Sequence, residues 1–344
     1  MSELKVSIVD QSPVHDEQGQ AQALRNTLEL AKQADELGYH RYWIAEHHAT
    51  PGYASPCPEI VIGQIAAHTR HIRVGSGGVM LSHYSPYKVA EVFKTLEAYH
   101  PNRIDLGFGR APGGNEASSQ ALAYPHAPTH AQQFPNQVAL LTGFVDGDNF
   151  TDTVFEGLKT TPQDSHAPQL WTLGSSDGSV DLAAHFGLGF GFVLALFIGT
   201  HERPATIISR YKAQFKARPE GFQSPQAMIA QAVICADSKE EAQLLAASHT
   251  YWKVLAFRHG IRESLRPPEQ CMDLYKQLSP SDQAYFMETR DSMITGTPEE
   301  CASELHRQAD FYDVDEVLAV AVTHSFKARC QSYQKLAAAL NLTT

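Results

Sequence analysis

The stretch Tyr42-Trp43-Ile44-Ala45-Glu46-His47-His48 runs from an apolar segment into a polar loop. Its first half is short and apolar, as expected of a buried strand. One carboxylate and two imidazoles follow, and groups that titrate near neutral pH are typical of places where protons move or ligands bind. The stretch therefore predicts a buried strand whose carboxyl end carries part of an active site.

The same pattern repeats along the chain, because short apolar runs alternate with longer amphipathic ones. Strands are expected at residues 5–9, 41–45, 72–80, 104–109, 169–173, 188–194, 228–235 and 316–322. Helices are expected near residues 20–37, 58–68, 87–99, 131–144, 179–186, 203–217, 239–253, 299–311 and 327–340. Eight strands, each followed by a helix, predict an α/β fold that closes into a single (β/α)8 TIM barrel over residues 1–344. An open doubly wound sheet stays as the alternative, because the pattern does not contain the strand order.

Two segments are longer than a minimal barrel requires. Residues 111–130 follow the fourth strand and residues 258–297 follow the seventh, which predicts long insertions after strands 4 and 7. Loops of this length usually cover a site or remain mobile. We expect the second insertion, at about residues 258–297, to be mobile and to act as a lid.

A helix start is marked by Thr297-Pro298-Glu299-Glu300. The threonine supplies a capping hydroxyl, the proline suits the first helical position, and the second glutamate lies three residues after the cap. This combination predicts a capping box in front of the helix expected at residues 299–311.

The composition is that of a soluble globular protein, with 43% hydrophobic and 19% charged residues among 344. A formal net charge of −11 without a block of Lys and Arg argues against a nucleic-acid surface. The most apolar run, residues 187–199, is too short to span a bilayer and is better explained as a buried strand. Five cysteines without a CxxC pair indicate neither a disulfide framework nor a zinc site, and no signal peptide is recognisable. We therefore expect a cytoplasmic protein that binds neither nucleic acid nor a membrane.

Further residues suited to ligand binding fall at the ends of other expected strands. Gly77-Gly78 lies late in the third strand, where glycines let the backbone approach a flat ligand or form a bulge. Arg110 follows the fourth strand, where a guanidinium could reach a phosphate or simply face solvent. Residues 174–179, Gly-Ser-Ser-Asp-Gly-Ser, lead into a helix and could seat a phosphate or form an ordinary helix cap. Active sites of parallel barrels gather at the carboxyl ends of the strands, so these positions should converge with His47 on one rim.

Two other kinds of site are disfavoured. The first strand ends in Asp10-Gln11-Ser12, without the His-x-His common in metal-dependent barrel hydrolases, so no metal is expected. Pro112 stands where a dinucleotide-binding GxGxxG would need its third glycine, which disfavours a Rossmann fold. The rim is therefore expected to hold another class of ligand.

Several dispersed motifs, in this order, resemble the bacterial luciferase-like family of flavin-dependent monooxygenases, particularly the luciferase α-subunit. The resemblance runs nearly end to end. It is carried by residues 43–48 (Trp-Ile-Ala-Glu-His-His), 74–81 (Val-Gly-Ser-Gly-Gly-Val-Met-Leu), 85–86 (Ser-Pro), 102–110 (Asn-Arg-Ile-Asp-Leu-Gly-Phe-Gly-Arg), 183–188 (Ala-Ala-His-Phe-Gly-Leu) and 296–301 (Gly-Thr-Pro-Glu-Glu-Cys). The family is a (β/α)8 barrel that binds FMN at its carboxyl rim, so the resemblance implies this fold and this cofactor.

The resemblance also implies roles for individual residues. His47 matches the family's catalytic histidine beside the flavin ring, and Glu116 matches a carboxylate that supports this histidine. Gly77-Gly78 matches a pair joined by a cis peptide under the ring, and Arg110 matches a phosphate ligand. The residues expected to bind the cofactor are Glu46, Gly77, Gly78, Arg110, Ser175, Ser176 and Ser179.

The activity that the resemblance implies is that of a two-component monooxygenase. A separate flavin reductase, as a transient partner, would supply reduced FMN, which reacts with O2 to give a flavin C4a-peroxide. This species would oxidise a small organic substrate, with an aldehyde as the family-level expectation, and His47 would act as a general base or proton relay. The helices after the second and third strands commonly pair subunits in the family, so a homodimer is expected.

Two departures from the family pattern keep other functions open. Gly109 stands where luciferase has a cysteine close to the flavin, and a second phosphate-binding arginine has no counterpart, since no Arg occurs between residues 111 and 202. The alternatives are a flavin-binding protein without catalysis and an oxidoreductase that uses the deazaflavin coenzyme F420 on the same barrel.

Overall fold

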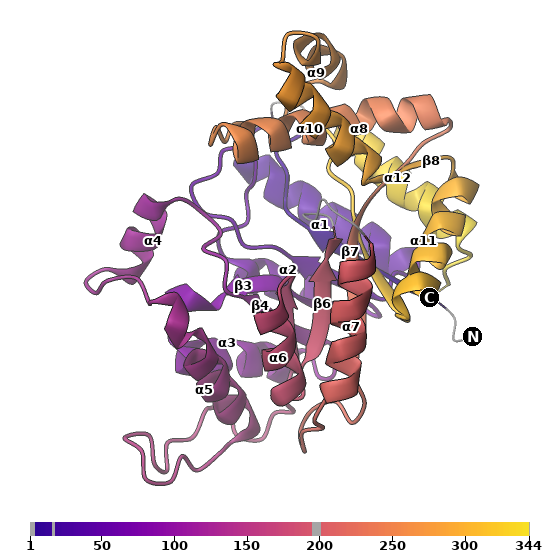
Figure 1. Cartoon of the computed structure of the whole chain (residues 1–344). Coiled ribbons are helices and arrows are strands. Elements are labelled where there is room, and N and C mark those ends of the chain that lie inside the picture. Colours follow the sequence, from indigo (N-terminus) through magenta and orange to yellow (C-terminus); the bar gives the residue numbers. More distant parts are fainter. Residues whose placement is uncertain (1–3, 16–17, 195–200, 344) are drawn as a thin grey trace.

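Eight parallel strands pair side by side into a closed barrel in the computed structural model, which describes residues 4–15, 18–194 and 201–343 (Figure 1). The strands pair in the order β6-β5-β4-β3-β2-β1-β9-β7, and β6 pairs with β7 to close the ring. They are β1 (Lys5–Asp10), β2 (Arg41–Ile44), β3 (Arg73–Met80), β4 (Ile104–Gly109), β5 (Gln169–Gly174), β6 (Gly189–Val193), β7 (Ala227–Cys235) and β9 (Glu316–Val320). The (β/α)8 TIM barrel that the sequence predicts is confirmed, and the open-sheet alternative is wrong.

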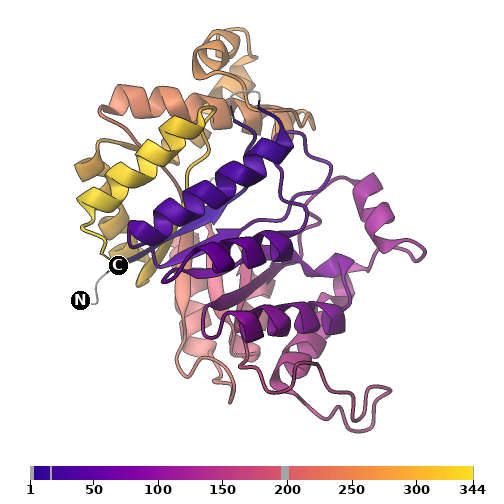
Figure 2. The same ribbon diagram turned by 180° about the vertical axis from the view of Figure 1, so that it is seen from behind.

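Helices follow the strands and cover the outside of the barrel (Figure 2). They are α1 (Gln20–Glu36), α2 (Pro58–His68), α3 (Pro86–Tyr99), α5 (Phe134–Asp146), α6 (Asp177–His185), α7 (Glu202–Gln214), α8 (Lys239–Lys253), α11 (Pro298–Tyr312) and α12 (Phe326–Ala339). α1 shows why they pack there, since Ala23, Leu30, Ala31 and Ala34 recur at helical spacing and are all buried. Among the described residues, no helix is both long and apolar enough to cross a bilayer.

The two long segments contain helices that the sequence reading missed. The segment after β4 includes α4 (Glu116–Ala123), and the segment after α8 includes α9 (Pro268–Tyr275) and α10 (Pro280–Asp291). A short strand, β8 (Ile294–Gly296), then pairs with the end of β7. Figure 1 shows α8, α9 and α10 together at one end of the barrel. The expected lid is therefore folded into helices rather than a continuous loop. Of the apolar run at 187–199, residues 195–199 lie outside the described residues.

A buried polar network fills the barrel at the amino ends of its strands. The Arg41 guanidinium donates to Glu316 at 2.7 Å and to Asp105 at 2.9 Å. Trp43 Nε1 donates to the same Asp105 carboxylate at 2.9 Å, and Arg41 lies over the Trp171 ring at 4.8 Å. Because these side chains occupy the interior, the space that remains for a ligand lies at the carboxyl ends of the strands.

The start of α11 carries the expected capping box. The Thr297 hydroxyl accepts from the Glu300 amide, and the Glu300 carboxylate accepts from the Thr297 amide. Thr297→Ala should lower the free energy of unfolding by about 1 kcal/mol, because it leaves a helix amide unsatisfied. Urea unfolding followed by tryptophan fluorescence measures this change. Thr297→Ser keeps the hydroxyl and should be nearly neutral; an equal loss in both variants would contradict the capping role.

Candidate active site

A cavity of about 280 Å³ opens at the carboxyl ends of the barrel strands, and five of the expected site residues line it. These residues are His47, Gly77, Gly78, Arg110 and Ser175. They come from the ends of β2, β3, β4 and β5, which are far apart in sequence and adjacent in the barrel. The convergence expected from the barrel topology is therefore observed.

His47 presents a buried nitrogen that no described residue satisfies. Its Nε2 has no hydrogen-bond partner, and its ring stacks on Tyr53 with centroids 4.7 Å apart. Burial, with smaller contributions from Arg262 and the neighbouring His48, lowers the pKa of His47 to about 4. The imidazole is therefore uncharged at neutral pH, with one nitrogen open to a ligand in the cavity.

Glu46 is buried beside the cavity rather than in its lining. Its carboxylate accepts from the Met80 amide at 2.8 Å and from the Tyr84 hydroxyl at 2.6 Å. His48 Nε2 lies 2.6 Å from the same carboxylate. These contacts join the end of β2 to the end of β3. Glu46 thus holds the two strand ends that carry His47 and Gly77-Gly78, and it influences the cavity only through them.

Gly77-Gly78 lies where two other strands approach the end of β3. The peptide bond between them is cis, as the resemblance implies. A Cβ on Gly77 would lie 2.9 Å from Val9 Cγ2, and one on Gly78 would lie 2.9 Å from the Gly107 carbonyl oxygen. The absence of side chains therefore lets the neighbouring strands pack closely against this backbone, which also lines the cavity.

The start of α6 suits an anion, and it directly follows Ser175, which lines the cavity together with Arg110. Within the described part of the chain, Arg110 is exposed and forms no ion pair. The hydroxyls of Ser176 and Ser179 lie 3.1 Å apart, and neither caps an amide of the helix. The first amides of α6, together with the helix dipole, are therefore available to a phosphate.

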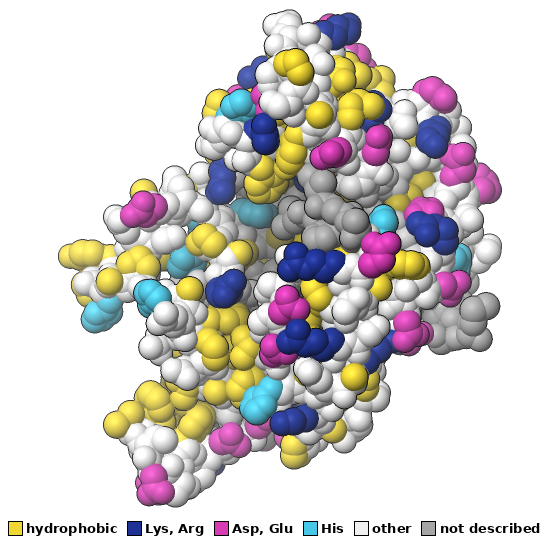
Figure 3. All heavy atoms as spheres, viewed as in Figure 1, with side chains coloured by type: hydrophobic (Ala, Val, Ile, Leu, Met, Phe, Trp, Pro, Cys, Tyr) yellow, Lys and Arg dark blue, Asp and Glu magenta, His cyan; other side chains and the backbone are white. Residues whose placement is uncertain are grey.

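Asp177, at the first position of α6, could oppose a phosphate there. Its carboxylate instead pairs with Arg210 of α7 at 3.0 Å and lies 3.8 Å from Arg203. Figure 3 shows Asp/Glu and Lys/Arg side chains side by side on this face of the molecule. The two arginines compensate the negative charge of Asp177, so it does not exclude an anion at the helix start.

Glu116 is not a partner of His47 in this structure. It is exposed at the first position of α4, and its carboxylate accepts from Gln120 Nε2 at 3.3 Å. Asn115 caps this helix through the Ser118 amide at 2.9 Å, which places Glu116 in the first turn. The expected His47–Glu116 contact is not formed in this structure, because the segment after β4 folds into a helix of its own.

Two cavity residues were missed by the sequence reading. His249 and Lys253, both in α8, line the cavity and are buried. Burial lowers the pKa of Lys253 to about 8; burial and the nearby Lys253 charge lower the pKa of His249 well below its usual value. Their spacing of four residues puts them on one face of the helix. Two polar residues on the buried face of a helix are the sequence pattern that could have identified them as cavity residues.

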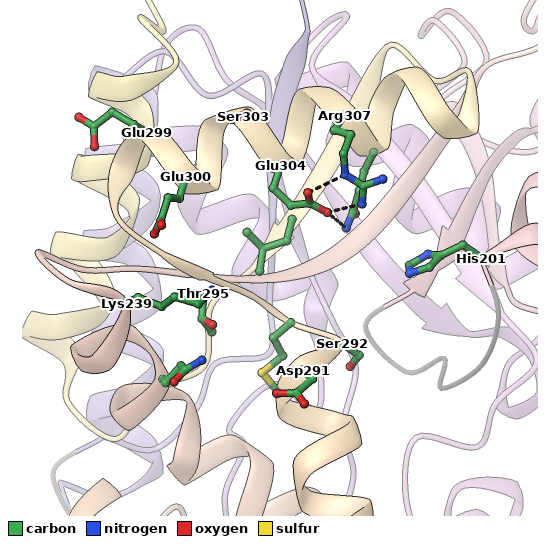
Figure 4. A pocket seen from close by; sticks show the side chains of 14 residues that line it. His201, Lys239, Asp291, Ser292, Thr295, Glu299, Glu300, Ser303, Glu304 and Arg307 are labelled. Atoms are coloured by element: carbon green, nitrogen blue, oxygen red, sulfur yellow. Dashed lines mark hydrogen bonds and ion pairs between the residues drawn. The ribbon is translucent and has the colours of Figure 1, made fainter.

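A second hollow, of about 860 Å³, lies between α8, α11 and β8 (Figure 4). Three of its charged side chains already have partners in the fold: Glu304 pairs with Arg307 at 2.6 Å, and Glu300 belongs to the capping box of α11. None of the expected site residues lines it. Among the described residues, no group of His, Cys, Asp and Glu is arranged to hold a metal ion. The cavity at the barrel end is therefore the candidate active site.

Comparison with known proteins assigns the family. The luciferase-like monooxygenase family profile matches residues 4–313. The N-acetyl-S-alkylcysteine monooxygenase of Bacillus subtilis (strain 168) is 36% identical over 338 residues, which cover 98% of each chain. The crystal structure of apo-MsnO8 has 35% sequence identity and a TM-score of 0.87, over 99% of each chain.

More distant structures share the fold with different cofactors. The oxygenating constituent of 3,6-diketocamphane monooxygenase from Pseudomonas putida, solved with FMN, has 16% identity, a TM-score of 0.73 and 98% coverage of each chain. An F420-dependent secondary alcohol dehydrogenase has 14% identity and a TM-score of 0.71, over 98% of this chain and 99% of that one. These likenesses concern the fold alone, whereas the profile and the two relatives above cover nearly the whole chain at higher identity. The chain belongs to the luciferase-like monooxygenase family.

Proposed function

We propose that this chain is the oxygenase of a two-component system, which binds reduced FMN from a separate reductase and uses O2 to oxidise a small organic substrate. The observation that carries the proposal is the convergence of His47, Gly77-Gly78 and Arg110 on one cavity at the carboxyl end of the barrel. Family membership supports the reaction class. The choice of FMN rests on the fit of the cavity to a flat ring and a phosphate.

The residues at the cavity fit FMN in three respects. Arg110 and the first amides of α6 would hold the phosphate, through a charged donor and a helix amino end. The Gly77-Gly78 backbone, which lines the cavity, would lie against the ring. Apolar walls, including Val9 and Val193, would exclude water around it. Reduced FMN, when bound, supplies the electrons with which O2 is activated.

His47 would hold or move a proton at its open Nε2. Its imidazole is neutral at pH 7, so this nitrogen can accept a proton or donate one, depending on the tautomer. A negative charge that develops beside it would raise its pKa, because an opposite charge favours the imidazolium. His47 is thus suited to take up a proton during the reaction and to return it afterwards.

Anaerobic titration with reduced FMN, and separately with reduced F420, tests the cofactor. We expect saturable binding of FMN and much weaker binding of F420.

Oxygen is then admitted with a flavin reductase present, and O2 consumption, H2O2 release and oxidised product are measured. N-acetyl-S-alkylcysteines are the first compounds to try, because a relative of 36% identity is named for them. Tight F420 binding without FMN binding would contradict the proposal. FMN binding that never yields an oxidised product would favour the flavin-binding protein without catalysis.

Arg110→Gln should weaken FMN binding by about tenfold to a hundredfold, because one charge-assisted contact with the phosphate is lost. Riboflavin, which lacks the phosphate, should bind both proteins equally. Fluorescence titration gives both dissociation constants. Arg25→Gln removes an exposed arginine from α1 and should leave both unchanged. An equal loss of riboflavin and FMN affinity in Arg110→Gln would show that Arg110 does not contact the phosphate.

The homodimer and the cytoplasmic location stay predictions. The helices expected to pair subunits, α2 and α3, expose Ile60 and Tyr99. Light scattering during size-exclusion chromatography measures the oligomeric state, and Ile60→Asp should shift a dimer toward monomer if α2 forms the interface.

A further inference from the structure

Lys253 is a buried cation in the wall of the cavity, and the cofactor site proposed above gives it no role. It is the last residue of α8 and only 4% exposed. His249, 5% exposed, lies one turn earlier on the same helix and lines the cavity as well. Both side chains thus enter the space in which a substrate would meet the flavin.

Aromatic contacts connect this end of α8 to His47. The Tyr53 ring stacks on His47 at 4.7 Å and contacts the Trp252 ring at 5.1 Å. Trp252 Nε1 donates to the Glu263 carbonyl oxygen at 2.8 Å, which anchors the helix end to the following segment. Lys253 is therefore attached to the same rigid framework as the catalytic candidate His47.

Most of the other described side chains of the wall are apolar. They are Val9, Ala45, Leu173, Val193, Ala230 and Val320, with Met80 and Ala111. With its pKa lowered by burial to about 8, Lys253 is still mainly protonated at pH 7, whereas His249 is neutral. Among the described lining residues, Lys253 is the buried cation and Arg110 the exposed one.

We propose that Lys253 and His249 bind a carboxylate of the substrate, so that the enzyme selects small acids with an apolar part that carries the atom to be oxidised. The ammonium supplies a charge-assisted hydrogen bond, and an imidazole N–H supplies a second one. The apolar walls then accommodate the rest of the molecule beside His47. This inference rests on the proposed function, because it takes the bound acid to be the substrate of that site. A different role, in which Lys253 faces the negative charge of reduced flavin, predicts a different result below.

Calorimetric titration of the protein without FMN tests the inference with matched probes. The probes are the straight-chain carboxylates from butanoate to octanoate and the corresponding primary amides, at pH 7. We expect the best acid to bind at least about tenfold more tightly than its amide, the scale of one charge-assisted contact. Lys253→Met should abolish this preference, and Lys253→Arg should retain part of it. In the wild type the preference should decline above pH 8, as the Lys253 ammonium loses its proton.

A matched control and separate FMN titrations keep the outcomes distinct. Lys239→Met removes an exposed lysine at the first position of the same helix and should leave the preference intact. Lys253→Met should fold, because replacing a buried charge by an apolar side chain is often neutral or stabilising, and circular dichroism checks this.

The inference is overturned if the wild type shows no preference for acids, including no binding of either probe, or if Lys253→Met keeps the preference. Loss of reduced-FMN affinity in Lys253→Met with the acid preference intact would assign the lysine to the flavin. A chain that binds acids but not FMN would refute the proposed function and leave the acid site standing.

Discussion

Replacing His47 with Gln should reduce coupled oxidation of an accepted substrate by about 10²- to 10⁴-fold, the range of positioned proton transfer. Glutamine keeps hydrogen-bonding atoms near the position of the imidazole but cannot take up a proton. The affinity for reduced FMN should change little, because the proposed phosphate contacts lie at Arg110 and α6. Product formed per O2 consumed, together with H2O2 release, measures the coupling.

His68→Gln is the matched control, since His68 is an exposed histidine on α2 outside the cavity. It should leave the coupling unchanged. Unchanged coupling in His47→Gln would remove His47 from the proton chemistry, whereas a large loss of FMN affinity would assign it to cofactor binding.

The pH dependence follows from the burial of His47. Its pKa of about 4 lies below the value of about 6.5 for an exposed histidine, so the ring stays neutral through the range in which such a histidine would titrate. The profile of kcat/KM, which reports the free enzyme, should therefore show no inflection from His47 near pH 6.5. An inflection near pH 6.5 that His47→Gln removes would contradict the buried state described here.

Replacing Asp10 with Ala should lower the free energy of unfolding by about 3–5 kcal/mol, because it leaves Arg329 buried without its carboxylate. The two groups are fully buried, with Arg329 Nη2 2.6 Å from Asp10 Oδ1. Tyr42 also donates to this carboxylate, as does the Ser12 amide at 2.7 Å. Urea unfolding followed by tryptophan fluorescence measures the change.

Two further variants separate the buried charge from other effects. Asp10→Leu combined with Arg329→Met removes both charges and should recover much of the stability lost in Asp10→Ala. Asp273→Ala breaks an exposed pair with Lys276, 2.8 Å apart, and should have a much smaller effect. If the double variant is as unstable as Asp10→Ala, packing rather than the unpaired charge explains the loss.

The same pair predicts how stability depends on pH. Burial alone would raise the pKa of Asp10, but the Arg329 charge and the hydrogen bonds from Arg329, Tyr42 and Ser12 keep it below its usual value. A carboxyl group with a lowered pKa in the folded state stabilises the fold above its unfolded pKa, near 4. This contribution should be lost as the pH falls through and below that value, and it should be absent in Asp10→Ala.

The parts of the fold that could be read from the sequence are those whose pattern is local. The strand at Ile104–Gly109 and the helices at Pro58–His68 and Lys239–Lys253 were predicted to the residue, because their apolar periodicity is interrupted by clear turn signals. β8 could not be found, since three residues are too few for a period of two. α4, α9 and α10 lie in segments rich in polar residues and proline, where local propensity competes with the turn reading.

In the candidate site, too, some residues could be predicted from the sequence and others could not. His47, Gly77-Gly78 and Arg110 were found because each ends a strand, and a parallel barrel brings all strand ends to one rim. Glu116 was assigned a contact that depends on the path of a 20-residue segment, and that path is set by the cap of α4 rather than by the strand before it. His249 and Lys253 were missed because their role depends on where α8 crosses the barrel end.

The sequence by itself determined the alternation of strands and helices, the strand ends that carry the chemistry and the family resemblance, because these patterns are encoded locally; the closure of the barrel became certain only from the pairing of β6 with β7. Only the tertiary structure decided which side chains enter the cavity. It turned Glu46 toward Met80 and Tyr84, left the His47 nitrogen open, and brought Lys253 from a distant helix into an apolar wall. The reason is physical: burial and charge at one point depend on every element packed around it, and the elements around this cavity extend along the chain from Val9 to Val320.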